Sequence, residues 1–428
     1  MRTSYGINFL KQRFNFKISK RSMGSVGMNN GRRRLMMMNP LVEKETLDPC
    51  VVLMKQIIAK HEGAWKKRND EIYSLAQGVV YWSPPSQAYQ YMDQYKDELH
   101  LYAPDEGWPA FRSSLEKKLQ KRNGLFSPHF MVTSGANQAF TNVVLTLMNG
   151  NSSDASNRKA LFFVPYYFNH VMAVQMVHGN DAVVLGPVDL HTGYPDIQWL
   201  EEKLNNDTNK DISMVTIANP GNPTGVNIPP EMIQQLASLC KEQQVWLVLD
   251  HTYEDFRYDE SSSEEHQQPQ QMDQNSYFPQ LDNVIHIFSM SKGYAMAGFR
   301  VGYVVLPSEQ MYNAMLKVQD TIAISAPKLS QVAALGALQW RESEDGEPDW
   351  VHARVQSLKQ GRDAILQALK PLSQILGGSG AMYLMAKLPE IIEDDVVSIL
   401  KAYPTFINKK MRNKIIVTIS YLFITLFI

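Results

Sequence analysis

Residues 289–303 read SMSKGYAMAGFRVGY and come directly after the apolar run VIHIF at 284–288. The apolar run predicts a short buried strand, so Lys292 lies just beyond the end of that strand. A lysine in this position can point its amine into a cleft, and it acts as a nucleophile towards carbonyl groups when its surroundings lower its pKa. Arg300 follows and supplies a fixed cation for a phosphate group. The alternative interpretation is a surface loop with an incidental lysine.

The residues around Lys292 favour the first interpretation. Ser289 and Ser291 form a small-x-small-Lys pattern with the lysine, and Gly-x-Arg-x-Gly follows at 298–302. The stretch resembles the lysine signature of class I/II aminotransferases, the pyridoxal-phosphate enzymes of fold type I. The resemblance implies that Lys292 is the catalytic residue and binds pyridoxal 5'-phosphate covalently. It also implies that Ser289, Ser291 and Arg300 contact this cofactor.

The length and composition indicate more than one domain. A chain of 428 residues is longer than one hydrophobic core usually organises, and 44% hydrophobic residues can fill two cores. The resemblance implies an α/β fold, with a large domain around a mostly parallel sheet flanked by helices and a small α/β domain from both chain ends. The expected parts are a basic leader at 1–42, small-domain segments at 43–95 and 326–400, the large cofactor-binding domain at 96–325 and a divergent apolar tail at 401–428. Apolar spacing predicts helices within 43–75, over 309–340 with a break at 325–327, and over 350–369.

A strand, a tight turn and a helix are expected in succession after residue 129. The strand covers 130–133 and the helix covers 138–148. Such a junction presents free backbone N–H groups and the positive end of a helix dipole, which suits a phosphate. The turn contains Ser134, Gly135 and Ala136, and the resemblance assigns these three residues to the phosphate of the cofactor.

Residues 161–164 predict another buried strand, and an aromatic segment follows it. An aromatic ring at this point can lie flat on a planar cofactor. The resemblance places the stacking ring at Tyr167, and packing in the core is the alternative role. We interpret His170 as structural. No set of His, Cys and acidic residues has metal-ligand spacing, so no metal is expected.

The loop NPGNPTG at 219–225 follows an expected strand at 214–218. Proline restricts the residue before it, so the two Asn-Pro pairs force an irregular loop, and such loops at strand C-termini bind ligands in open α/β sheets. The loop matches the family's NPxNPTG pattern. The match implies that Asn222 contacts both the phenolic oxygen of the cofactor and the carboxylate of the substrate.

Residues 245–250 read VWLVLD, five apolar residues that end in a carboxylate. A buried acid is costly unless it meets a cation, and a protonated pyridine nitrogen is such a cation. The resemblance implies this role for Asp250 and a contact between Tyr253 and the phenolic oxygen of the cofactor. The alternative is that Asp250 caps the following helix.

Two loops earlier in the chain complete the expected site. Gly78 precedes the aromatic pair Tyr81-Trp82 and two prolines, which suggests a shaped loop, and a plain turn with core aromatics is the alternative. In the resembled family this loop closes over the substrate, with its glycine near the substrate carboxylate. Tyr102 corresponds to the tyrosine that reaches the cofactor phosphate of the neighbouring subunit. The resemblance therefore implies a homodimer with a shared active site.

Charge and cysteine content limit the possible partners and location. A net charge of −1 gives no global attraction to nucleic acid or to an anionic membrane. Two cysteines imply no disulfide framework, so a cytoplasmic location is expected. Residues 1–42 contain nine basic and no acidic residues, which fits an organellar transit peptide as well as an untranslated or disordered leader. The apolar run at 415–428 extends about 21 Å as a helix, short of the ~30 Å of a bilayer core. A buried strand or a misplaced reading of the gene is therefore favoured over a membrane anchor.

The resemblance ends near residue 400. The family continues to an arginine on a strand that grips the α-carboxylate of the substrate. Arg412 is the only arginine after Arg362, and it lies among lysines without that pattern. We therefore expect a pyridoxal-phosphate aminotransferase for aromatic or methionine-like amino acids and 2-oxo acids. The alternatives are a cofactor-binding isoform that does not turn over, and a lyase or synthase of the same fold.

Overall fold

The structure is a computed structural model, and it describes residues 39–46, 73–74, 78–148, 158–208, 210–258, 274–342, 350–371, 374–387, 415–416, 418–420 and 423–427. Most of the basic leader and most of the helix expected within 43–75 lie outside the described residues. The helices are α2 Pro40–Lys44, α4 Ser86–Gln94, α5 Pro109–Asn123, α6 Ala136–Leu147, α7 Phe168–His178, α8 Ile197–Asn205, α9 Pro230–Glu242, α10 Glu309–Ala323, α11 Lys328–Glu342, α12 Trp350–Gln356 and α13 Lys359–Leu369, with short 3-10 turns at Lys96–Glu98, Asn180–Ala182, Gln274–Tyr277 and Ala297–Phe299. The strands are β1 Tyr73–Ser74, β2 Phe130–Thr133, β3 Lys159–Phe163, β4 Val183–Gly186, β5 Ile212–Ala218, β6 Trp246–Asp250, β7 Val284–Ser289, β8 Gly302–Val305, β9 Ile375–Gly377, β10 Tyr383–Lys387, β11 Ile415–Ile416, β12 Thr418–Ser420 and β13 Phe423–Phe427.

The centre of the described part is a seven-stranded sheet with the order β2-β8-β7-β6-β5-β3-β4. Strand β8 runs antiparallel to both of its neighbours, and the other pairs are parallel. The expected α/β fold with a mostly parallel sheet is therefore confirmed. Each of the five strands expected from apolar runs appears in this sheet, because a parallel sheet covered on both faces favours continuous apolar segments.

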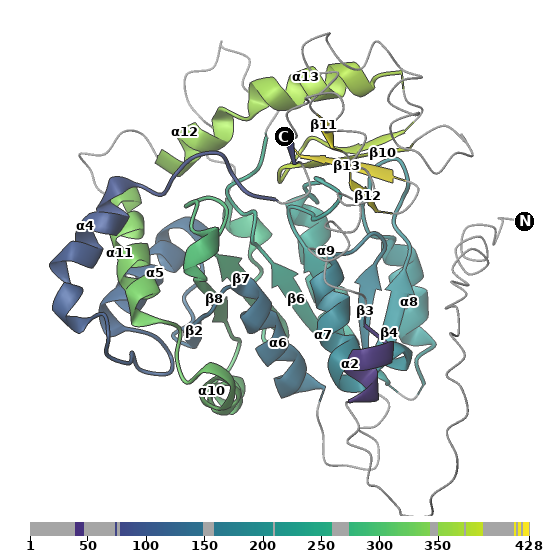
Figure 1. Cartoon of the computed structure of the whole chain (residues 1–428). Coiled ribbons are helices and arrows are strands. Elements are labelled where there is room, and N and C mark those ends of the chain that lie inside the picture. Colours follow the sequence, from purple (N-terminus) through teal and green to yellow (C-terminus); the bar gives the residue numbers. More distant parts are fainter. Residues whose placement is uncertain are drawn as a thin grey trace, which may run out of the picture. The chain divides into compact units, whose positions relative to one another are not determined.

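Helices cover both faces of the sheet (Figure 1). Neighbouring residues of a strand point to opposite faces, so Phe162 packs in the core beneath α6, α7 and α10, whereas Leu161 packs in the core beneath α8 and α9. A third core lies beneath α5 and α11 and contains Phe288 and Tyr303 from β7 and β8. These buried apolar side chains supply the main stabilisation of the large domain, at about 1.5–3 kcal/mol for each fully buried large residue.

The parallel strands β3, β5, β6 and β7 all end at the same edge of the sheet. Asp250 is the last residue of β6, and the segments after β3, β5 and β7 hold Tyr167, Asn222 and Lys292. Open α/β sheets bind ligands outside the carboxyl ends of their strands, because the loops there converge. The sheet order thus gathers residues that are far apart in the sequence.

The helices differ from the sequence expectation in one respect. The break at 325–327 is confirmed, since α10 ends at Ala323 and α11 begins at Lys328. The single helix expected over 350–369 is instead two helices, α12 and α13. Between them the Ser357 hydroxyl donates to the carbonyl of Arg354 at 2.6 Å. A serine that bonds to the preceding turn competes with the helical pattern, which accounts for this break.

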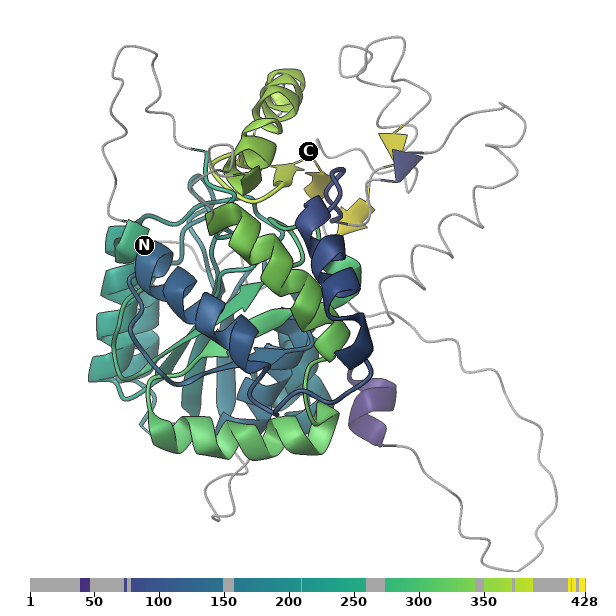
Figure 2. The ribbon, with the colours of Figure 1, turned by 90° about the vertical axis from the view of Figure 1, so that its left-hand side faces the viewer.

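A second, four-stranded sheet has the order β12-β13-β10-β9, and α13 lies beside it (Figures 1 and 2). Leu369 of α13 and Leu384 of β10 belong to one small hydrophobic core. Strand β13 pairs antiparallel with all of β10, from Tyr383 opposite Phe427 to Lys387 opposite Phe423. The apolar tail therefore does form strands, as expected, although its side chains lie outside the description. Among the described residues no helix is both long and apolar enough to cross a membrane.

Candidate active site

Lys292 lies three residues beyond β7, and its side chain is half-buried. Its Nζ donates a hydrogen bond to the carbonyl oxygen of Gly78, so the structure brings these two expected site residues together. Burial, and then the positive charge of Arg300, lower the pKa of the Lys292 amine to about 8. A larger fraction of this amine is therefore neutral near neutral pH than in an exposed lysine, and a neutral amine can attack a carbonyl or accept a proton.

Contacts from distant segments fix the backbone around Lys292. The indole N–H of Trp82 donates to the carbonyl of Gly293 at 3.3 Å. The carboxylate of Asp255 lies against the same glycine, since a Cβ on Gly293 would sit 2.6 Å from its Oδ2. No larger residue fits there without displacing Asp255. The loop that carries the lysine is thus held by the aromatic pair at 81–82 and by the segment that follows β6.

Asp250 is the last residue of β6 and is buried. Its Oδ2 lies 3.0 Å from Nε2 of His170, and its Oδ1 accepts hydrogen bonds from the backbone N–H and the hydroxyl of Thr252 at 2.9 and 2.6 Å. Burial alone would raise the pKa of Asp250, but the contacts with His170 and Thr252 outweigh burial and lower it. The carboxylate is therefore ionised at neutral pH and can hold a proton on a basic ring nitrogen.

His170 orients Asp250, and the sequence did not predict this role for the histidine. Its ring packs against Phe140 at 4.2 Å between centroids and against Tyr167 at 5.1 Å, and its exposed fraction is 3%. The residue is more than the structural histidine that the sequence indicated, because one ring nitrogen meets the site carboxylate. Its position two residues into α7, after the aromatic segment, was the only signal in the sequence.

Tyr253, Asn222 and Tyr383 form a chain of hydrogen bonds. The hydroxyl groups of Tyr253 and Tyr383 are in contact, and Nδ2 of Asn222 donates to the Tyr383 hydroxyl at 3.3 Å. Burial raises the pKa values of both tyrosines, so both carry their protons at neutral pH. Tyr383 is a second residue that the sequence did not predict for the site, since it lies on β10 of the other sheet.

The turn at 134–136 and Arg300, the residues expected to form a phosphate cradle, lie against each other. A Cβ on Gly135, whose φ is +85°, would collide with the guanidinium of Arg300, whose Cζ lies 2.9 Å from that point. The helix α6 begins at Ala136 without a side-chain cap. Its first N–H groups have no intrahelical acceptor, so they and the guanidinium are available to one anion.

The two serines of the lysine signature lie close to this cradle. Gly302 pairs with Thr133 on one side and with Ser289 on the other, which brings the end of β7 beside the start of α6. The Ser289 hydroxyl accepts the backbone N–H of Ser291 at 3.1 Å. Three features therefore fit a phosphorylated ligand. A Cβ would not fit at Gly135, the guanidinium of Arg300 lies against this glycine, and the N-terminus of α6 has no side-chain cap.

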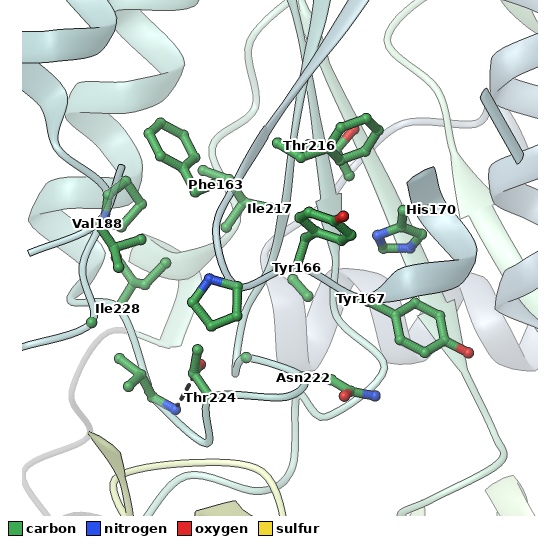
Figure 3. A pocket seen from close by; sticks show the side chains of 17 residues that line it. Phe163, Tyr166, Tyr167, His170, Val188, Thr216, Ile217, Asn222, Thr224 and Ile228 are labelled. Carbon is green, nitrogen blue, oxygen red and sulfur yellow. Dashed lines mark hydrogen bonds between the residues drawn. The ribbon is translucent and has the colours of Figure 1, made fainter. Parts of the chain in front are cut away.

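Tyr167 precedes α7 and borders a cavity between the segments that follow β3 and β5 (Figure 3). In that view Tyr167, His170 and Asn222 lie at one end of the cavity, and Val188 and Ile228 lie at the other. Burial raises the pKa of the Tyr167 hydroxyl, which accepts a hydrogen bond from Asn169 at 3.0 Å. The Tyr167 ring therefore lies beside His170, the residue that contacts Asp250.

Tyr102 is the exception among the expected site residues. Among the described residues, no contact joins it to the others. Its side chain is 80% exposed. An exposed tyrosine has no packing role within the chain, so its position is compatible with a contact to another subunit. Among the described residues there is also no group of three or more His, Cys, Asp or Glu that could hold a metal ion.

Two buried ion pairs anchor the segment that carries Tyr253. Nζ of Lys118, on α5, lies 2.6 Å from Oε1 of Glu254, and Asn123 joins the same pair through hydrogen bonds at 2.8 and 2.9 Å. Arg341, on α11, lies 2.7 Å from Oδ1 of Asp255. These pairs tie two helices to the residues directly after Tyr253.

The structure combines a mostly parallel sheet flanked by helices, a half-buried lysine beyond β7 and an ionised aspartate at the end of the neighbouring strand β6. This combination defines a pyridoxal-phosphate-dependent transferase of fold type I. The family model "Aminotransferase class I and II" matches residues 72–419. The chain belongs to this family, and the cofactor of the family is pyridoxal 5'-phosphate.

Similar proteins agree with this assignment. The chain is 40% identical over 329 residues to the aromatic aminotransferase ISS1 of Arabidopsis thaliana, a match that covers 75% of this chain and 76% of the relative. It is 25% identical to a probable aspartate aminotransferase of Methanocaldococcus jannaschii over 68% of this chain and 71% of the relative. A solved aspartate aminotransferase of Thermus thermophilus has a similar fold, with a TM-score of 0.73, 21% identity and coverage of 92% of this chain and 95% of the other.

Proposed function

We propose that this protein transfers the amino group between an aromatic or methionine-like amino acid and a 2-oxo acid, with Lys292 as the catalytic residue. The observation that carries the proposal is the Lys292 amine, whose pKa is lowered to about 8 at the sheet edge where Asp250 and Asn222 also lie. The substrate preference is supported by the 40% identity to an aromatic aminotransferase.

The proposed roles follow from the chemistry of each group. Pyridoxal phosphate, when bound, supplies an electron-withdrawing ring that lowers the cost of removing the α-proton of an amino acid. Lys292 anchors the cofactor and then moves that proton as a general base and acid. Asp250 keeps the ring nitrogen protonated, and Tyr253 and Asn222 donate to the phenolic oxygen.

The remaining expected contacts hold the cofactor in place. Tyr167 stacks on the ring. Ser134, Gly135 and Ala136 at the start of α6, together with the side chains of Ser289, Ser291 and Arg300, would hold the phosphate. This division suits the charges, because Arg300 and the helix start are positive where the phosphate is negative, whereas Asp250 is negative where the ring nitrogen is positive.

We also propose a cytoplasmic homodimer in which Tyr102 of one subunit reaches the phosphate site of the other. The support is the 80% exposure of Tyr102 in the single chain. Sedimentation velocity gives the oligomeric state. Replacing Tyr102 with phenylalanine is expected to weaken cofactor binding about tenfold and leave the sedimentation coefficient unchanged, as expected for one lost charge-assisted hydrogen bond.

The function is tested with purified protein loaded with cofactor. Phenylalanine, tyrosine or methionine is added without a 2-oxo acid, and the visible absorbance of the bound cofactor and the release of one equivalent of 2-oxo acid are measured. We expect both signals with these amino acids, and weaker signals with aspartate. Lys292→Ala is expected to abolish both. In cofactor-free protein, the rate of coloured-complex formation is expected to rise with pH through about 8, where half of the amine is neutral, and to level off above that pH.

A specific observation supports a second candidate, a protein that binds the cofactor without turnover. Arg412 is the only arginine beyond Arg362, and it falls outside the described residues. It lies among lysines without the pattern expected of the carboxylate-binding arginine, although the family model matches as far as residue 419. A buried charge-assisted contact is worth about 1.5–3 kcal/mol, so its loss weakens substrate binding by roughly 10- to 150-fold. A coloured complex that no amino acid changes would support this candidate and contradict the first.

A further inference from the structure

Tyr383 is a buried residue of the C-terminal sheet that touches two residues of the cofactor site. Its ring lies edge-on to the ring of Tyr253, with centroids 5.3 Å apart and planes at 78°. Its hydroxyl contacts that of Tyr253 and accepts a hydrogen bond from Nδ2 of Asn222 at 3.3 Å. Tyr253 and Asn222 come from loops after two different strands, so Tyr383 connects them.

The backbone holds Tyr383 tightly against the Asn222 loop. The carbonyl group of Tyr383 lies so close to Gly225 that a Cβ there would collide with it. Strand β10 is also paired on both sides, with Gly377 of β9 opposite Leu384 and with Phe427 of β13 opposite Tyr383. The phenol is therefore fixed from the sheet that includes the C-terminal tail.

The direction of the hydrogen bonds has a chemical consequence. The amide of Asn222 has only N–H protons at Nδ2, so it donates and the Tyr383 oxygen accepts. Each tyrosine has one hydroxyl proton. When Tyr383 donates to Tyr253, the proton of Tyr253 remains free for another acceptor, such as the phenolic oxygen of the cofactor. When Tyr253 donates to Tyr383 instead, that proton is used within the protein.

We infer that Tyr383 is a positioning residue that donates to the Tyr253 hydroxyl and so directs the Tyr253 proton towards the cofactor. This inference rests on the proposed contact between Tyr253 and the phenolic oxygen. Tyr383 itself need not touch the cofactor. Its position also gives the C-terminal strand β13 a role in the site, because this strand pairs with the strand that carries the phenol.

The test compares Tyr383→Phe with Tyr258→Phe in the full-length protein loaded with pyridoxal phosphate. Both substitutions remove one hydroxyl from a buried tyrosine of the same core, and the Tyr258 hydroxyl has no hydrogen-bond partner among the described residues. The visible absorbance of the bound cofactor is titrated with pH in the absence of substrate. This readout does not depend on turnover.

We expect Tyr383→Phe to raise the midpoint of this titration by about one pH unit, the equivalent of one hydrogen bond. Weaker donation leaves more negative charge on the cofactor, which then holds its proton more tightly. Tyr258→Phe should leave the midpoint unchanged. Once Tyr253→Phe is present, Tyr383→Phe should add little further change, because its effect passes through the Tyr253 hydroxyl.

Three results would overturn the inference: an unchanged midpoint in Tyr383→Phe, equal changes in Tyr383→Phe and Tyr258→Phe, or additive changes with Tyr253→Phe. A Tyr383→Phe chain that fails to fold while Tyr258→Phe folds would also overturn it, since the hydroxyl would then serve stability. Wild-type protein that forms no coloured complex contradicts the proposed function itself. A coloured wild-type complex with an unmoved midpoint contradicts only the role of Tyr383.

Discussion

Replacing Lys118 with methionine removes the positive partner of a buried carboxylate beside the site. The exposed fractions of the two side chains are 1% for Lys118 and 9% for Glu254, and their charged atoms are 2.6 Å apart. The amine also lies 4.6 Å from the centre of the Phe288 ring. Methionine keeps much of the length and apolar stem of lysine, so the main change is the loss of charge.

The magnitude follows from the distance and the burial. At 2.6 Å and an effective dielectric constant of about 20, the attraction is about 6 kcal/mol, and it is offset by a desolvation cost of several kcal/mol for each ion. The net contribution of the intact pair is therefore small. Removing only Lys118 leaves Glu254 buried with Asn123 as its remaining partner in this cluster, and we expect a loss of about 3–5 kcal/mol in the free energy of unfolding.

The assay is urea unfolding followed by tryptophan fluorescence, with cofactor binding measured in parallel. The double variant Lys118→Met/Glu254→Gln should be at least about 2 kcal/mol more stable than Lys118→Met alone, because no buried charge is left unpaired. Lys241→Met is the matched control: its partner Asp282 lies 3.0 Å away, but both side chains are exposed, so a loss below about 1 kcal/mol is expected. A small loss for Lys118→Met, or a double variant as unstable as the sum of the single changes, would refute the reasoning.

Three further predictions concern the cradle, the buried histidines and the tail. Gly135→Ala forces a Cβ against Arg300 at a left-handed backbone position, so the dissociation constant of pyridoxal phosphate should rise at least about tenfold in an absorbance titration; an unchanged constant would contradict the cradle. His251 and His286 are buried 3.0 Å apart, and burial lowers the pKa of His251 well below 6.5 and that of His286 to about 4. The unfolded chain therefore binds more protons than the folded chain below pH 6.5. The free energy of unfolding should fall as the pH drops from 6.5 towards 4, by about 3 kcal/mol for His286 alone. His286→Gln should flatten this pH dependence, which urea titrations at several pH values measure. Deleting residues 415–428 removes β13, one of the two partner strands of β10, so the truncated chain should unfold at a lower urea concentration and show the raised titration midpoint of Tyr383→Phe. A wild-type midpoint would mean that the tail does not hold the phenol.

Much of the fold could be predicted because its signals are local. The apolar runs that end at Phe288 and Asp250 each lie within a few residues of a chemically distinctive side chain, and a buried parallel strand needs such a run. The turn before α6 was likewise visible, since a glycine between a strand and a helix has few alternatives. The positions of five strands followed from these runs and the α/β class followed from the family resemblance, whereas the domain boundaries stay predictions.

Residue type and spacing near Lys292, Asp250 and Asn222 by themselves indicated a candidate nucleophilic amine, a buried acid and an irregular Asn-Pro loop, each at or just after a strand end. The family resemblance assigned their roles. Only the tertiary structure decided that His170 meets Asp250, and that Tyr383 meets Tyr253 across 130 residues of sequence. The same holds for the pairing of Lys118 with Glu254, 136 residues apart. Periodicity describes one segment at a time, whereas such contacts depend on the order of the strands and on the burial of polar groups that must find partners.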